Sequence, residues 1–177
     1  MLNNKNSQFA LLHEIFILDA HLASPLVTQN RIEITNNFIN EFLQILGLEP
    51  LGDLGVFDAA DLRAPGWSFI QPITTSHISG HYFEKPGRQA HIRIDAYSCD
   101  AINWKNLLQV CDKHFSLSDW RANFIEREIE PAQNRRVLDL AGTGPIVFYE
   151  DDLISQKNQH NDELSSTQIK EACHAIS

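Results

Sequence analysis

The sequence predicts an α+β fold, in which a largely antiparallel β-sheet is backed by two helices on one face. Two helical segments interrupt a series of strand segments, and most strands are joined by turns too short to hold a crossover helix. The length of 177 residues is that of one domain with a single core. We therefore expect one domain over residues 1–150, followed by a polar tail over residues 151–177 that is the segment least expected to be ordered.

The first part of the chain predicts a strand, a helix and a short strand, in that order. Residues 9–19 form a short apolar run that is typical of a buried strand. Apolar residues then recur at helical spacing over residues 32–46, after capping side chains at 28–30 and before Gly47 as a stop. Residues 48–61 are rich in turn formers and predict a turn with a short strand.

The rest of the chain predicts a β-rich stretch, an alternating strand, a second amphipathic helix and two further strands. These elements span residues 67–82, 90–99, 103–115, 122–130 and 144–149. Pro72 interrupts the first of them, and Pro86-Gly87 predicts a turn before the second. In the alternating strand the apolar residues share one face, whereas His91, Tyr97 and Cys99 lie on the other.

Composition excludes several classes of function. The chain carries 14 Lys and Arg against 23 Asp and Glu, a net charge of −9, with no basic run that would favour nucleic acid or an anionic membrane. No apolar run reaches the roughly 18 residues that span a bilayer, and the N-terminus lacks the pattern of a signal peptide. Three cysteines without a CxxC motif indicate a reducing compartment, so we expect a cytoplasmic protein.

Residues 68–99 concentrate the side chains that carry chemistry. If Pro86-Gly87 closes a hairpin, counting back along its strands brings Cys99 within a few residues of Ser76. Ser76 and His81 present a geometric problem, because five residues of extended strand separate them by about 16 Å and direct them to opposite faces. One chain therefore cannot easily bring these two side chains together.

Three segments resemble the prokaryotic S-adenosylmethionine decarboxylases, which are pyruvoyl-dependent and self-processing. They are LLHEIFILDAH, TTSHISGHYFE and HIRIDAYSCDAINWKNLLQVCDKHF, in the order in which the family has them, across residues 9–130. The resemblance implies an S-adenosylmethionine decarboxylase-like domain. Its product would be decarboxylated S-adenosylmethionine, the aminopropyl donor for spermidine synthesis.

The resemblance also implies a role for each motif residue. The chain would cleave itself between Thr75 and Ser76, and Ser76 would become the pyruvoyl cofactor that forms a Schiff base with a substrate amine. His81 would be the processing base and Cys99 the proton donor to the substrate, with a weaker processing role for Ser68. This chemistry requires no metal.

The family's active sites lie between protomers, so the resemblance predicts a homodimer with two shared sites that bind a small amine-bearing substrate. Ser76 and Cys99 would come from one chain, with Ser68 and His81 from the other. Such sharing would remove the geometric problem on the strand.

The sequence departs from the family at two places. Thr75 stands where the family usually has glutamate before the cleaved bond. After the motif histidine the family commonly has Thr-Trp-Pro-Glu, whose glutamate binds the substrate ribose, whereas this chain has Tyr82-Phe83-Glu84-Lys85. Phe83 and Glu84 are the candidate substrate-binding residues. Decarboxylation of a basic amino acid, ornithine or arginine, and a non-processing regulatory or binding role remain the alternatives.

The remaining motifs predict structure rather than chemistry. The segment VLDLAGTG at residues 137–144 resembles a methyltransferase glycine motif, but too little chain follows it to build a Rossmann sheet, so it predicts an ordinary turn. Cys111 lies on the apolar stripe of the second helix, so we expect it in the core. For His77 we expect a structural or surface role. Cys173 and His174 in the polar tail make a poor metal site.

Overall fold

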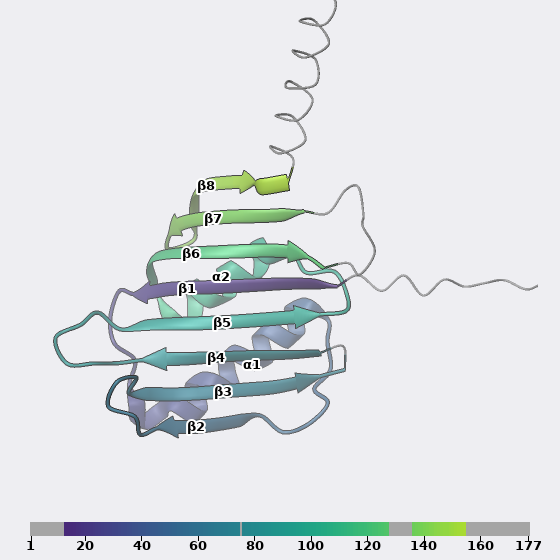
Figure 1. Cartoon of the computed structure of the whole chain (residues 1–177). Helices are drawn as coiled ribbons and strands as arrows, with labels where there is room; N and C mark the ends of the chain where they lie inside the picture. Colours follow the sequence, from purple (N-terminus) through teal and green to yellow (C-terminus); the bar gives the residue numbers. More distant parts are fainter. Residues whose placement is uncertain (1–12, 75, 128–135, 155–177) are drawn as a thin grey trace, which may run out of the picture.

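The computed structural model describes residues 13–74, 76–127 and 136–154. They form one eight-stranded sheet with the order β2-β3-β4-β5-β1-β6-β7-β8, in which every pair is antiparallel (Figure 1). The strands are β1 Glu14–Leu22, β2 Gly55–Ala59, β3 Gly66–Ile73, β4 Ser76–Phe83, β5 His91–Ser98, β6 Leu117–Glu126, β7 Val137–Thr143 and β8 Ile146–Asp152. The helices are the short η1 Thr28–Asn30, α1 Arg31–Leu46 and α2 Trp104–Phe115. The predicted α+β class is confirmed.

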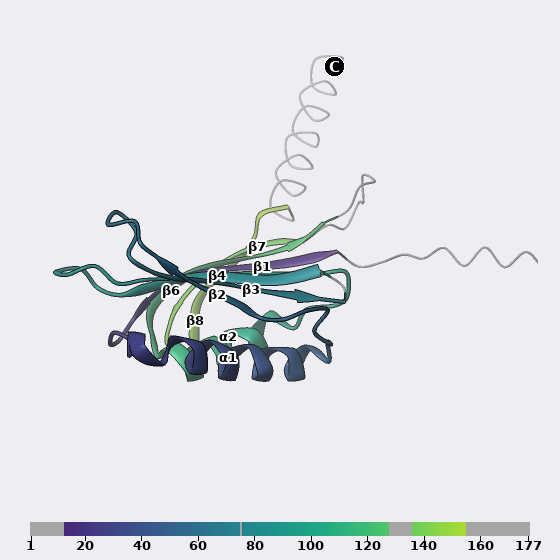
Figure 2. The same cartoon turned by 90° about the horizontal axis from the view of Figure 1, so that it is seen from below.

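Helices α1 and α2 lie side by side on one face of the sheet (Figure 2). The core lies between the helices and the sheet. Alternate residues of the central strands, such as Phe16 and Ile94, are completely buried there, in one cluster with Phe38 and Phe42 of α1. No element among the described residues covers the opposite face, which we call the open face.

Local sequence signals account for the C-terminal end of α1 and the N-terminal end of α2. Gly47 ends α1 in the left-handed conformation at φ 65°, as predicted from its position. Asn103 begins α2, and its side chain accepts a hydrogen bond from the backbone N–H of Asn106. The capping prediction at residues 28–30 is wrong in detail, because these residues form η1 and Asn30 makes no side-chain cap.

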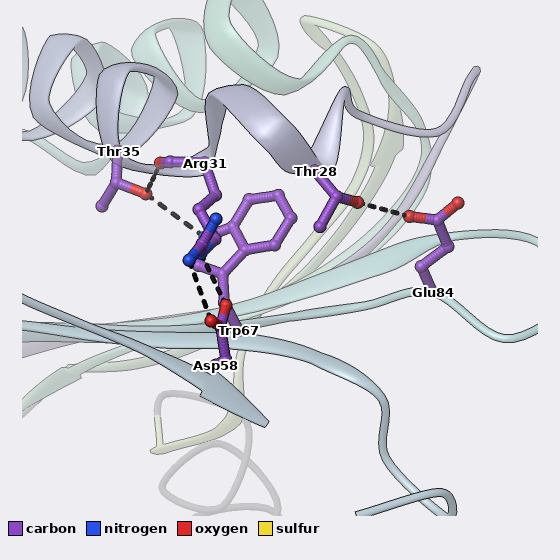
Figure 3. Close-up of polar contacts among 6 residues, drawn as sticks. All are labelled: Thr28, Arg31, Thr35, Asp58, Trp67 and Glu84. Carbon is purple, nitrogen blue, oxygen red and sulfur yellow. Dashed lines mark hydrogen bonds and ion pairs between the residues drawn. The ribbon is translucent and has the colours of Figure 1, made fainter. Parts of the chain in front are cut away.

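Polar contacts attach α1 to the β2–β3 edge of the sheet (Figure 3). Arg31 donates a hydrogen bond of 2.8 Å to Asp58 on β2. The indole N–H of Trp67 on β3 donates to the Thr35 hydroxyl at 3.2 Å, and that hydroxyl donates to the Arg31 carbonyl at 2.7 Å. These contacts fix the helix above the strands that carry the candidate site.

The structure divides the β-rich stretch at 67–82 into two strands, β3 and β4, which pair with each other. Pro72 is tolerated inside β3 because the pairing with β2 stops at Ile70. Beyond that residue the outer edge of β3 has only an isolated bridge, from Pro50 to Ile73, so no strand ladder there needs the N–H that proline lacks. Strand β7 was not predicted, and β6 begins at Leu117, five residues before the expected start of 122.

Strand β8 continues to Asp152, so the first residues of the expected tail belong to the sheet. The remainder of that tail, beyond residue 154, lies outside the described residues. Of the helices in the described part of the chain, none has the length and apolar character that a membrane span requires.

Candidate active site

Ser68 and His81 form a hydrogen-bonded pair on the open face. The register of β3 and β4 places the two residues directly opposite each other, and Ser68 Oγ lies 2.6 Å from His81 Nδ1. Burial lowers the pKa of His81 from its usual 6.5, and the backbone of Ala64 offsets this only in part. The imidazole is therefore neutral at pH 7, and its Nδ1 can accept the serine proton.

The second ring nitrogen of His81 has no such partner. Nε2 is buried and makes no hydrogen bond of normal geometry with the described residues. The tautomer of the ring decides which partner donates in the Ser68–His81 hydrogen bond. Burial disfavours the charged imidazolium, which accounts for the lowered pKa of His81.

The pair lies in a hollow of about 410 Å³ on the open face. The hollow is lined by Phe57, Ser68, Phe69, Ile70, Ser79, Gly80, His81, Arg93 and Asp95. Desolvation, followed by the charge of Asp19, raises the pKa of Asp95 above its usual range. The hollow is the size of a small-molecule site, and its lining includes polar side chains from β3, β4 and β5.

Phe83 lies beside the pair, at the end of β4. Its ring centroid is 4.0 Å from that of His81 and 4.4 Å from that of His91, with which it is nearly parallel at 7°. Arg93 lies over the Phe83 ring at 5.9 Å. Of the two candidate substrate-binding residues, Phe83 is therefore on the open face and next to His81.

Glu84, the other candidate, points to the helix-bearing side of the sheet. Its carboxylate accepts a hydrogen bond of 3.1 Å from the Thr28 hydroxyl (Figure 3), and another of 3.1 Å from the Tyr82 hydroxyl. Tyr82 is fully buried, and desolvation is the main cause that raises its pKa to about 12. Glu84 thus lines neither the Ser68–His81 hollow nor the neighbouring one around Phe83.

Ser76 and Cys99 lie together at the opposite end of β4. Ser76 is the first residue of the strand, with its Oγ 3.2 Å from His77 Nδ1. His77 pairs with Tyr97 on β5, and Cys99 follows two residues later. The hairpin register expected from the sequence, with Cys99 within a few residues of Ser76, is the one that the structure has.

Tyr97 is the centre of a polar cluster at this end, which sequence reasoning missed. Its hydroxyl is 2.8 Å from His13 Nδ1 and accepts a long hydrogen bond of 4.0 Å from the Cys99 thiol. The Arg127 guanidinium lies 4.9 Å from the centre of the Tyr97 ring. The alternation of the β5 sequence predicts that Tyr97 shares a face with Cys99. No local pattern indicates that His13, which precedes β1, and Arg127, which follows β6, contact Tyr97.

One chain keeps these two groups of residues apart. Ser68 and His81 lie near one end of β4, and Ser76 begins the other end. The intervening extended chain covers about 16 Å. The candidate active site is thus present as two halves, one with the serine–histidine pair and one with Ser76 and Cys99.

Other sequence motifs lie outside this arrangement. Cys111 is completely buried in the core, where desolvation raises the pKa of its thiol, and Gly144 makes the β7–β8 turn at φ 49° in an antiparallel sheet. Thr75, Cys173 and His174 are outside the described residues. In the part of the chain that is described, no three His, Cys, Asp or Glu side chains are grouped to hold a metal ion.

Comparison with known proteins agrees with the geometry. The family model described as S-adenosylmethionine decarboxylase matches residues 17–128. Among solved structures, the adenosylmethionine decarboxylase from Aquifex aeolicus VF5 has a TM-score of 0.53 and 14% sequence identity. That match covers 70% of this chain and 97% of the other. No curated protein matches the chain significantly in sequence.

Proposed function

The chain belongs to the S-adenosylmethionine decarboxylase family, and from that premise we propose that it is a self-processing, pyruvoyl-dependent decarboxylase of S-adenosylmethionine. Its product would be decarboxylated S-adenosylmethionine for spermidine synthesis, in the cytoplasm. The observation that carries the proposal is the hydrogen bond between Ser68 and His81, which places a neutral base and a hydroxyl together on the open face.

Maturation begins at the bond between Thr75 and Ser76. The Ser76 hydroxyl attacks the Thr75 carbonyl and converts the peptide bond to an ester, while the Ser68 hydroxyl donates to the developing oxyanion. His81 then removes the Ser76 α-proton, and elimination releases Thr75 as a free carboxylate. The remaining enamine takes up water and loses ammonia, which leaves a pyruvoyl group at residue 76.

The residues at the Ser76 end fit such a group. Ser76 is the first residue of a strand and half-buried, so a new chain end there can stay in the sheet. When formed, the pyruvoyl ketone supplies an electrophile for the substrate amine and a sink for the electrons released with CO2. Cys99, in the same part of the sheet, then returns a proton to the substrate carbon, and Tyr97 holds its thiol.

The two half-sites make a complete site only when two chains combine. We infer a homodimer in which Ser68 and His81 of one chain act on Ser76 of the other, because one chain holds them about 16 Å apart. Phe83, beside His81, would then contact the substrate bound at the partner's Cys99 end.

Intact-mass spectrometry of the purified protein tests self-cleavage. We expect two fragments, residues 1–75 and 76–177, whose summed mass equals that of the whole chain plus water and minus ammonia. Ser76→Ala should leave the chain whole, whereas Ser118→Ala, a matched change on β6 outside the candidate site, should not. A folded wild-type chain that stays whole would favour the non-processing regulatory or binding role.

Substrate identity is tested by release of CO2 from carboxyl-labelled compounds. We expect release from S-adenosylmethionine and none from ornithine or arginine. Release from either amino acid alone would establish the alternative, a pyruvoyl decarboxylase of a basic amino acid.

A further inference from the structure

A second hollow, of about 500 Å³, lies next to the Ser68–His81 hollow. It is lined by His21, Arg63, Ala64, Pro65, Phe83, Lys85, Arg88, Gln89 and His91. All of its charged side chains other than histidine are cations, in a chain whose net charge is −9. Such a local reversal of sign favours a negatively charged ligand.

The turn between β4 and β5 holds two of these cations close together. The backbone N–H of Arg88 donates to the Lys85 carbonyl at 3.0 Å, and Gly87 adopts φ 76° after Pro86. Proline at the second position and a glycine with positive φ at the third are the signature of a type II turn. The Cα atoms of Lys85 and Arg88 in such a turn lie within about 7 Å of each other.

Carboxylates do not neutralise this pair. Within the described residues, neither Lys85 nor Arg88 forms an ion pair, whereas Arg63 is bound to Asp61 at 2.6 Å. The nearest acid in sequence, Glu84, is turned to the helix-bearing side by Thr28 and Tyr82. Two positive charges therefore stand at the ends of one turn, and no ion pair within the described residues neutralises them.

We propose that this hollow binds an oxyanion, a phosphate or carboxylate group of a small molecule, between Lys85 and Arg88. Lys85 and Arg88 supply the charge, and both are suited to multiple hydrogen bonds with oxyanion oxygens. Phe83 lines the hollow and contacts His81, so the bound molecule lies beside the Ser68–His81 pair. The site does not depend on formation of the pyruvoyl group.

Isothermal titration calorimetry of the purified full chain at low salt tests this site, with inorganic pyrophosphate and citrate as separate probes. We expect saturable binding of at least one probe to one site per chain. The double variant Lys85→Gln/Arg88→Gln should raise the Kd at least about tenfold, since both charges are lost. Tighter binding of pyrophosphate identifies a phosphate site, and tighter binding of citrate a carboxylate site.

Two further variants make the test specific. Arg121→Gln removes an exposed cation from the open face but not from this hollow, and should leave the Kd unchanged. Arg88→Lys keeps the charge and should retain most of the affinity. Absence of saturable binding to both probes, or equal weakening by Arg121→Gln, would overturn the proposal. The measurement needs no turnover, so its failure and the failure of the decarboxylase proposal are separate results.

Discussion

At the scale of single residues, the Ser68–His81 contact links structure to the proposed reaction. A hydroxyl 2.6 Å from a neutral imidazole is well placed for proton transfer, and neither residue is needed for the core. Removing one of them should therefore affect maturation more than folding.

Ser68→Ala should slow self-cleavage about a hundredfold, the usual effect of losing one oxyanion donor. A time course on denaturing gels measures the rate. Loss of the hydrogen bond to half-buried His81 should lower the free energy of unfolding by only about 1 kcal/mol, measured by urea denaturation. Ser68→Thr, which keeps the hydroxyl, should recover much of the rate. Cleavage of Ser68→Ala at the wild-type rate would exclude Ser68 from the reaction.

The pH dependence of cleavage follows from the lowered pKa of His81. The base must be neutral, and burial places its pKa below 6.5. The rate should therefore be level from about pH 8 to about pH 6.5 and fall only at lower pH, as the imidazole gains its proton. The rate of fragment formation in buffers of equal ionic strength measures this profile. An acid limb centred above pH 6.5 would identify another group as the base.

At the scale of elements, α1 is attached to β3, the strand that carries Ser68. The Thr35 hydroxyl, with the residue only 2% exposed, joins the helix backbone to the indole of Trp67 on β3. Ser68, the next residue along β3, faces the other side of the sheet. Trp67, which contacts the helix, and Ser68, which belongs to the candidate site, are thus neighbours on one strand.

Thr35→Val should lower the free energy of unfolding by about 1–3 kcal/mol, because it leaves the buried indole N–H of Trp67 without an acceptor. Urea denaturation measures the change. Thr28→Val is the matched control, since Thr28 is exposed and loses only its contact with Glu84, so we expect a change within about 0.5 kcal/mol. If both variants lower the free energy of unfolding equally, the buried hydrogen bond between Trp67 and Thr35 is not what stabilises the attachment of α1 to β3.

At the scale of the whole molecule, the sheet separates the two halves of the candidate site along β4. Ser76 and Cys99 lie at one end, and Ser68 and His81 near the other, with an open face between them. In the proposed homodimer, a second chain would bring complementary halves together.

Co-expression of Ser76→Ala and His81→Ala chains should restore cleavage of the His81→Ala chain, because its partner supplies an intact His81. Each variant expressed alone should stay whole. Mass spectrometry identifies which chain is cut, since the two differ at residues 76 and 81. If no fragment forms in a mixture shown to contain mixed dimers, the shared-site proposal is wrong.

Local patterns in the sequence were enough for the fold class and for the identity of the candidate residues. The alternation of residues 90–99 and the Pro86-Gly87 turn predicted a hairpin, and the spacing of Ser68, Ser76 and His81 carried the family resemblance. Alternation and turn chemistry are properties of neighbouring residues, so they can be read without the rest of the chain.

The tertiary structure decided which side chains meet. Only the register of β3 and β4 places Ser68 opposite His81, and hydrogen bonds from Thr28 of η1 and from Tyr82 hold the Glu84 carboxylate on the helix-bearing side. The Tyr97 cluster likewise joins His13 and Arg127 from distant parts of the chain. Register and partner choice depend on burying one face of the whole sheet, a long-range constraint that no local pattern contains.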